Sequence, residues 1–415
     1  GCTRFGLSTL ASALPEGTEA PPDGLLPASV SAGASQRNFG LYLHVPFCEV
    51  RCGYCDFNTY TAQELEGVSQ GSYPAKAAAE LDLAFHVLNE AGMPQRPLST
   101  VFFGGGTPTL LGPEPLVDLL QRSRSLWGLA EGAEVTVEAN PDSVSAEDLA
   151  ALAAGGVTRV SFGVQSANAQ VLATLDRTHN PHSVPTVVQA AKDAGLEVSL
   201  DLIYGTPGET LEQWESTLSY ALDLAPNHIS AYALIVEAGT KLAARIKRGE
   251  IAPIDDDLHA DMYLLADDLL ARAGYEWYEI SNWATSEQTH SRHNKAYWAS
   301  DDWWGIGPGA HSHIGGVRWW NVKHPAAYAA RMDAGLSPAK AREVLSTQQH
   351  SMEKILLGLR MREGIPTSLI GAGHREDLAA WVGRGYLQGE DLLAGHIVLT
   401  QSGRLVADYL ATQLT

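Results

Sequence analysis

The chain has 415 residues, of which 45% are hydrophobic and 18% charged, so it can bury a large core and is long enough for two or three domains. Its 28 basic and 48 acidic side chains give a net charge of −20. That balance argues against a nucleic-acid partner, since phosphate-backbone binding depends on Lys and Arg contacts. No apolar stretch reaches the roughly 18 residues of a membrane span, so we expect no transmembrane segment.

Residues 1–37 are rich in Ala, Gly, Ser and Pro. They lack the basic start and the apolar stretch of a signal peptide. We therefore expect a disordered leader rather than a signal or transit peptide. Without such a signal, and with thiolates that must stay reduced, the sequence indicates a cytoplasmic protein.

Three of the four cysteines, Cys48, Cys52 and Cys55, form a C-x3-C-x2-C run directly after a short apolar segment. A loop this short can place three thiolates around one iron–sulfur cluster. A closed cluster needs four protein ligands, and this run supplies three. One iron would then be free to bind a small molecule. Cys2 lies in the leader, and we do not assign it as a ligand.

Two other interpretations of the cysteines are weaker. A structural zinc site needs a fourth N or S ligand, and the nearby His44 lies on the other side of a Pro-containing turn. A disulfide framework is disfavoured because four cysteines are too sparse for a stapled chain of this length. The sequence therefore favours an iron–sulfur cluster.

From residue 38, predicted strands alternate with predicted helices, which indicates βαβ units and a parallel sheet. Six such units predict an α/β fold with a partial (βα)6 TIM-like barrel over residues 38–235. The sequence from Ser145 to Asp148 has the pattern of a helix capping box. The predicted strands are 41–45, 100–103, 134–139, 159–164, 197–203 and 228–234, and the predicted helices are 74–90, 113–126, 145–154, 170–175, 181–194 and 211–224.

Polar residues or glycines stand where four of these strands end. Glu138, Gln165 and Asp201 lie at three of the ends, and Gly104-Gly-Gly-Thr107 follows another. The carboxyl ends of barrel strands form the face on which active sites are built. The glycines let a ligand approach the backbone closely, which would suit the amino group of a ligand. Each residue alone could simply cap a loop, but together they predict a ligand site beside the cysteine loop.

Residues 236–342 are predicted to form an extension that caps the barrel. They contain seven of the ten tryptophans and the segment Ser291–Trp298, which combines a histidine, an amide and two aromatic residues. Aromatic residues usually pack in a core. An aromatic and imidazole-rich surface would also suit a porphyrin, whose iron takes an axial histidine. Both interpretations remain open, with His293 as the leading haem-ligand candidate and His311 and His313 as others.

Residues 343–415 are predicted to form a small C-terminal winged-helix-like α+β domain. The expected elements are a helix over 346–360, a helical pair near 368–383, a strand over 396–399 and a closing helix over 403–413. The acidic composition disfavours DNA binding. We expect this domain to pack against the barrel.

These motifs resemble the radical S-adenosylmethionine proteins of the oxygen-independent coproporphyrinogen III oxidase group, and within that group the HemW-type haem chaperones. The resemblance extends from about residue 40 to the C-terminus. It rests on the cysteine run, Gly-Gly-Gly-Thr-Pro, Glu-Ala-Asn-Pro, Gly-Val-Gln-Ser, and the segment His293-Asn-x-x-Tyr-Trp298.

The resemblance implies a [4Fe-4S] cluster on the three cysteines, with S-adenosylmethionine on the open iron, and haem as a further ligand. It also implies a haem-acceptor protein, such as a respiratory cytochrome, and a flavodoxin- or ferredoxin-type electron donor. The implied S-adenosylmethionine residues are Tyr42, Gly105, Gly106 and Thr107 for the methionine end, Glu138, Gln165, Arg177 and Asp201 for the methionine and ribose groups, and Ala233 and His311 for the adenine side.

Two departures distinguish this chain from the oxidases of the group. The oxidases carry a further cysteine two residues after the third, where this chain has Phe57. They also have an ordered N-terminal extension, whereas this leader is of low complexity. The resemblance therefore favours haem binding and delivery over oxidative removal of two propionate carboxyls. A third hypothesis is a radical methyltransferase that acts on an aromatic natural product.

Overall fold

The computed structural model describes residues 16–55, 57–61, 65 and 69–415. A curved 13-stranded sheet dominates it, in the strand order β1-β13-β12-β11-β10-β2-β3-β4-β5-β6-β7-β9-β8. Six parallel strands in chain order form the middle of the sheet and confirm the predicted partial barrel. They are β2 (Phe39–Val45), β3 (Leu98–Gly105), β4 (Leu129–Ala139), β5 (Arg159–Gln165), β6 (Glu197–Tyr204) and β7 (His228–Ala233).

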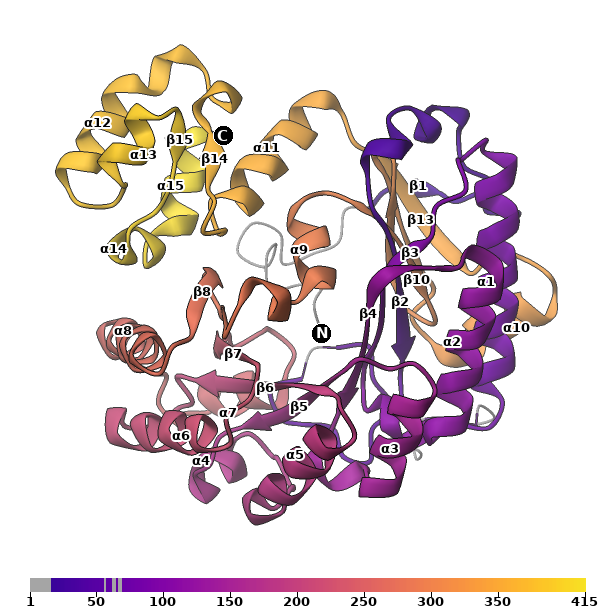
Figure 1. Cartoon of the computed structure of the whole chain (residues 1–415), viewed down its shortest axis with the longest axis horizontal. Coiled ribbons are helices and arrows are strands. Elements are labelled where there is room, and N and C mark those ends of the chain that lie inside the picture. The colour runs from indigo at the N-terminus through magenta and orange to yellow at the C-terminus, as the bar shows by residue number, and fades with distance from the viewer. Residues whose placement is uncertain (1–15, 56, 62–64, 66–68) are drawn as a thin grey trace.

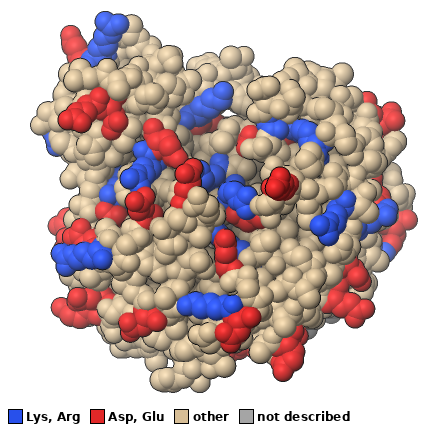
Figure 2. Space-filling view, viewed as in Figure 1, with Lys and Arg blue, Asp and Glu red and all other residues tan. Residues whose placement is uncertain are grey.

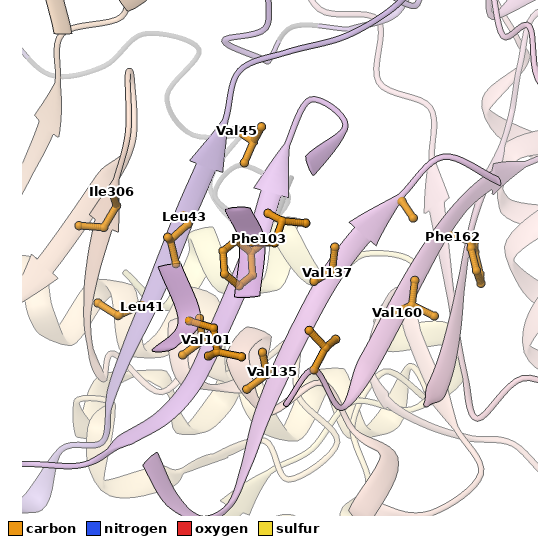
Figure 3. Close-up of a cluster of buried hydrophobic side chains, with 14 of the residues drawn as sticks. Leu41, Leu43, Val45, Val101, Phe103, Val135, Val137, Val160, Phe162 and Ile306 are labelled. Carbon is orange, nitrogen blue, oxygen red and sulfur yellow. The ribbon is translucent and has the colours of Figure 1, made fainter. Parts of the chain in front are cut away.

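Helices cover the outer face of these strands (Figure 1). The apolar side chains that point toward them, such as Leu43, Phe103 and Val137, are fully buried (Figure 3). At the start of α3 (Ala146–Ala154), Ser145 and Asp148 each accept a hydrogen bond from the other's backbone N–H, which confirms the capping box. The outer helices are α1 (Tyr73–Glu90), α2 (Pro113–Trp127), α3 (Ala146–Ala154), α4 (Ala169–Thr174), α5 (Val184–Asp193) and α6 (Leu211–Asp223).

Residues 236–342 lengthen the sheet at both edges instead of forming a separate cap. β9 and β8 continue it beyond β7, and β10 pairs in parallel with β2 and is followed by β11 and β12. Only α9 lies on the concave side of the sheet (Figure 1). The elements are α7 (Lys241–Lys247), α8 (Asp256–Arg272), β8 (Glu276–Glu279), β9 (Asn282–Ala284), α9 (Arg292–Trp298), β10 (Asp302–Ile306), β11 (His311–Ile314), β12 (Val317–Asn321) and α10 (Pro325–Asp333).

The expectation of a disordered leader is wrong for residues 16–37. β1 (Thr18–Glu19) pairs with the edge strand β13 (Ala339–Val344), and Val30 is fully buried. Arg37 donates a hydrogen bond to the buried Asp302 over 2.9 Å. The segment is ordered because it covers an open sheet edge and supplies a charge to a buried carboxylate. Residues 1–15, with Cys2, lie outside the described residues.

Residues 347–414 form a module with its own hydrophobic core, in agreement with the predicted α+β domain (Figure 1). The single closing helix that we expected is two helices, because the chain turns at Leu405 and Val406. The elements are α11 (Thr347–Gly358), β14 (Ile365–Pro366), α12 (Arg375–Gly383), α13 (Gly389–Leu393), β15 (His396–Ile397), α14 (Gln401–Arg404) and α15 (Ala407–Leu414).

The surface carries charges of both signs. Figure 2 shows Lys and Arg side chains interspersed with Asp and Glu on this face, without one continuous basic patch. Within the described residues, no helix is both long and apolar enough to cross a membrane.

A buried ion pair fastens the C-terminal module to the barrel. Arg404 of α14 donates to Asp267 of α8 over 2.7 Å, and their side chains are 4% and 10% exposed. The guanidinium also lies over the Trp277 ring, 4.1 Å from its centroid. Removal of one partner from such a pair leaves a buried charge without compensation.

We predict that Arg404→Met lowers the free energy of unfolding by about 3 kcal/mol, because Asp267 stays buried without its cation. Arg122→Met breaks the exposed pair with Asp82 and should cost less than about 1 kcal/mol. Urea unfolding of both variants measures the difference. Equal losses would show that the buried pair does not secure the module.

Candidate functional site

The cysteine loop follows β2 and is held by backbone contacts with two distant elements. Gly53 donates its N–H to the Leu175 carbonyl over 3.1 Å and accepts from the N–H of Leu242, in α7, over 2.9 Å. The Tyr54 ring packs against an apolar cluster in which these two leucines take part. The loop is therefore fixed between the end of α4 and the start of α7.

The glycine-rich end of β3 packs directly against this loop. Gly106 donates to the Val45 carbonyl over 2.8 Å, and Thr107 donates to the Phe47 carbonyl over 2.7 Å. A Cβ atom on Gly106 would lie 2.3 Å from that Phe47 oxygen and 3.0 Å from the Cys48 sulfur. No other residue type fits here without a shift of the cysteine loop. The expected close approach of the glycines thus serves the loop as well as any ligand.

A single cavity brings most of the predicted site residues together at the carboxyl ends of the strands. The Gly105 N–H donates to Glu138 over 3.2 Å, which joins the ends of β3 and β4 inside it. Eleven predicted residues line this cavity: Cys48, Cys52, Cys55, Gly105, Gly106, Thr107, Glu138, Gln165, Arg177, Asp201 and Ala233.

Arg177 is the cation that faces the cysteines. Its Nη1 lies 3.6 Å from the Cys52 sulfur, and its other terminal nitrogen donates to the Gly163 carbonyl. Burial, and then the neighbouring Cys55, raise the pKa of Cys48 to about 11. The Cys48 thiol is therefore protonated at neutral pH unless a metal binds and displaces its proton. The half-buried Arg177 guanidinium acts in the opposite direction and favours the thiolate form of Cys48.

Asp201 and Glu138 form an acidic wall in the same cavity. Burial, and then the negative charge of Glu138, raise the pKa of Asp201 to about 6, although Ser161 donates a hydrogen bond to it over 2.9 Å. Two half-buried carboxylates in one cavity attract a cation and can accept hydrogen bonds from hydroxyl groups. The wall therefore suits a ligand that carries an amine, a sulfonium or a ribose diol.

Gln165 adopts a backbone conformation that is uncommon for its residue type. Its φ is 64°, and the register between β5 and β6 shifts at this position. A residue other than glycine in this region costs about 1 kcal/mol or more, and such residues concentrate at functional sites. In this conformation Gln165 lines the cavity.

Three predicted site residues do not line the cavity. Tyr42 lies in the core, where its OH bonds His44 Nδ1 over 2.9 Å. His311 starts β11 and faces the Trp320 ring at 6.2 Å between centroids. His293 is 1% exposed and bonds Thr100 and Tyr297 through its two ring nitrogens. The structure therefore does not support His293 as a haem ligand, because neither nitrogen is available to iron.

The sequence prediction missed the inner part of the cavity. The walls of this inner part come from strand residues that lie further from the carboxyl ends of the strands, and from the start of α9. The signal was present, because these strands alternate polar and apolar residues where buried parallel strands are usually apolar throughout. The missed residues are Thr136, Arg159, Ser161, Ser199, His228, Ser230, Ser291 and Asn294.

The donor set fits an iron–sulfur cluster with three protein ligands. Three sulfurs line one cavity beside the half-buried Arg177, whose buried Nε has no hydrogen-bond partner among the described residues. Within those residues, no three His, Cys, Asp or Glu side chains converge on a point suited to one metal ion. A cluster does not need such convergence, since each thiolate binds a different iron.

A partial (βα)6 barrel with this cysteine loop and this cavity is the architecture of a radical S-adenosylmethionine protein. The sequence profile of the radical SAM superfamily matches residues 42–221. The chain is 46% identical over 377 residues to heme chaperone HemW of Mycobacterium tuberculosis, covering 91% of this chain and 94% of that protein. It is 37% identical to heme chaperone HemW of Bacillus subtilis, and this match covers 78% of this chain and 84% of that protein. The chain therefore belongs to the HemW family of the radical SAM superfamily.

A solved structure supports the fold assignment. Coproporphyrinogen III oxidase (HemN) from Escherichia coli, a radical SAM enzyme, matches with a TM-score of 0.79. The match covers 99% of this chain and 98% of that chain at 21% identity. At this identity the likeness shows the shared fold alone.

We predict that Asp201→Asn changes how the stability of the ligand-free protein depends on pH. The folded-state pKa of Asp201, about 6, lies above its ordinary value of 3.8, so the wild type loses stability as pH rises between these values. Asn does not titrate. The variant should gain about 2 kcal/mol relative to the wild type between pH 4 and pH 7. Urea unfolding across this range measures the gain, and parallel curves would contradict it.

Proposed function

We propose that this chain is a haem chaperone that binds haem and passes it to an acceptor protein, and that it carries a [4Fe-4S] cluster and S-adenosylmethionine. The observation that carries the proposal is the 46% identity, over 91% of the chain, to a protein named heme chaperone HemW. The cavity supports the cofactor part, since it joins three cysteines to an acidic wall.

In this proposal Cys48, Cys52 and Cys55 hold the cluster. Arg177 balances the negative charge of the thiolates. Glu138 and Asp201 accept hydrogen bonds from the amine and ribose hydroxyls of S-adenosylmethionine, and the Gly105–Thr107 backbone borders its methionine end. When bound, the cluster supplies an open iron and one-electron chemistry. These side chains are half-buried, so they are partly shielded from water, which strengthens their interaction with a cationic ligand.

The oxidase alternative has less support. Phe57 lines the cavity at the position where the oxidases carry a further cysteine, and a phenyl ring offers neither a thiolate nor a proton donor. The likeness to the solved oxidase is limited to 21% identity. A respiratory cytochrome as haem acceptor and a flavodoxin- or ferredoxin-type electron donor remain parts of the proposal.

We predict that anaerobic reconstitution yields about four irons per chain and a broad brown absorption. Cys52→Ala should abolish both, because it removes one of the three ligands. Cys2→Ala is the matched control and should keep the full iron content. Iron analysis and the visible spectrum measure the result. An equal loss of iron in the two variants would contradict a three-cysteine site.

We predict that haem titration gives a saturable Soret shift in the wild type and that His293→Ala leaves this shift unchanged. The imidazole is buried and fully hydrogen-bonded, so the substitution should instead lower the free energy of unfolding by about 2–4 kcal/mol, through the lost bonds and the cavity. Loss of the Soret shift with unchanged stability would restore His293 as a ligand.

One experiment separates chaperone from oxidase. The reconstituted protein is incubated anaerobically with haem, or with coproporphyrinogen, S-adenosylmethionine and a one-electron reductant. The proposal expects retained haem that can be transferred to an apo-cytochrome, and no protoporphyrinogen. Catalytic formation of protoporphyrinogen would contradict the chaperone proposal and support the oxidase hypothesis.

A further inference from the structure

Thr59 is a buried residue next to the cysteine loop that the proposed S-adenosylmethionine site does not use. Its side chain is 2% exposed, and it is not among the residues that line the cavity. Its Oγ1 lies 3.7 Å from the Cys55 sulfur, a distance at which a hydroxyl can form a hydrogen bond with sulfur. Thr59 therefore contacts a predicted cluster ligand without being part of the cavity wall.

Backbone hydrogen bonds hold Thr59 against the start of the cysteine loop. The N–H of Tyr60 donates to the Pro46 carbonyl over 2.7 Å, and the Tyr60 carbonyl accepts from the N–H of Cys48 over 3.0 Å. The Thr59 N–H donates to the Phe57 carbonyl over 2.8 Å. The segment after the cysteines thus turns back toward the residues that precede them, which places Thr59 beside the sulfurs.

Asn58, the residue before Thr59, fastens this segment to distant parts of the chain. Its side-chain amide donates to the carbonyls of Pro308 over 3.1 Å and Lys323 over 2.7 Å. Its own carbonyl accepts from His44 Nε2 over 2.8 Å. These partners lie on β2 and on the loops that flank the β11–β12 pair. The tertiary structure therefore fixes the position of the Thr59 hydroxyl.

The Thr59 hydroxyl stabilises negative charge on the sulfurs. A metal-bound thiolate has no proton, so in its pair with Thr59 it can only accept a hydrogen bond. Burial raises the pKa of the Cys48 and Cys55 thiols, and in both cases the Thr59 hydroxyl opposes this rise. The hydroxyl is thus a hydrogen-bond donor to the ligand end of the proposed cluster.

We propose that Thr59 raises the reduction potential of the cluster through this hydrogen bond. The inference rests on the cofactor part of the proposed function. Hydrogen bonds to the sulfurs are one of the means by which a protein tunes such a potential. Reduction adds one electron from an external one-electron donor, and no bond of the protein forms or breaks. Because the added electron increases the negative charge on the sulfurs, a donor to a sulfur favours the reduced state.

The test measures the reduction potential of the reconstituted full chain by anaerobic titration with a chemical one-electron reductant, followed by EPR spectroscopy. Thr59→Val removes the hydroxyl and keeps the shape of the side chain. We expect it to lower the ratio of reduced to oxidised cluster at a fixed potential by about threefold or more, which is about 30 mV for one electron. Thr59→Ser keeps the hydroxyl and should stay close to the wild type. Thr59→Ala, a second variant without the hydroxyl, should show the same shift as Thr59→Val.

Thr217→Val is the matched control. Thr217 is fully buried on α6, where its Oγ1 accepts from the Ala167 N–H over 3.1 Å. The same substitution there should leave the potential unchanged, because the hydrogen bond that it removes is to the backbone and not to a sulfur. An equal shift in Thr217→Val and Thr59→Val would overturn the inference.

The remaining outcomes separate this inference from the proposed function. A change below about 1.5-fold in Thr59→Val, with full iron content, would overturn the role of Thr59 and leave the proposed function standing. Loss of iron from Thr59→Val and Thr59→Ala, but not from Thr59→Ser, would show that the hydroxyl holds the ligands instead of tuning the potential, and would also overturn it. Failure of the wild type to bind haem, with the shift intact, would contradict the chaperone proposal and leave the role of Thr59 standing.

Discussion

The site depends on one close backbone contact, between the glycine-rich end of β3 and the first residues of the cysteine loop. Gly106 and Thr107 donate to the carbonyls of Val45 and Phe47, and there is no room for a side chain on Gly106. This contact fixes the start of the cysteine loop against the end of β3. Tyr54, Leu175 and the start of α7 hold the other side of the loop. The cysteine loop, which has little regular secondary structure, is thus held on both sides.

The inside of the barrel is polar, which is costly for a parallel sheet that is covered on its outer face. Hydrogen bonds between the polar side chains offset this cost. Ser199 bonds His228 over 2.8 Å, and Ser161 donates to Asp201 over 2.9 Å. Around the cavity, Thr136, Asn294 and Arg177 each keep a buried side-chain atom that has no hydrogen-bond partner within the described residues. Gln165, at the same cavity, has a left-handed backbone, and both features cost stability.

Haem binding is the part of the proposed function that the described fold constrains least. The histidine that the sequence favoured as a ligand is part of the packing that closes the inner end of the barrel. Its neighbours Phe102 and Tyr297 surround the imidazole ring, so the aromatic character of the segment reflects core packing. The identity to heme chaperones over nearly the whole chain still separates this protein from the oxidases that share its fold.

The sequence by itself determined the six βα units, the capping box at Ser145, the cysteine loop and most of the strand-end residues. These follow from local patterns: residue alternation, short spacings, and the rule that the carboxyl ends of parallel strands share one face. Only the tertiary structure decided that residues 16–37 are ordered, that β8–β13 extend both sheet edges, and that His293 is buried while Asn294 faces the cavity. The physical reason is that each of these depends on partners far away in the chain, such as Asp302 for Arg37 and Thr100 for His293, which no local pattern encodes.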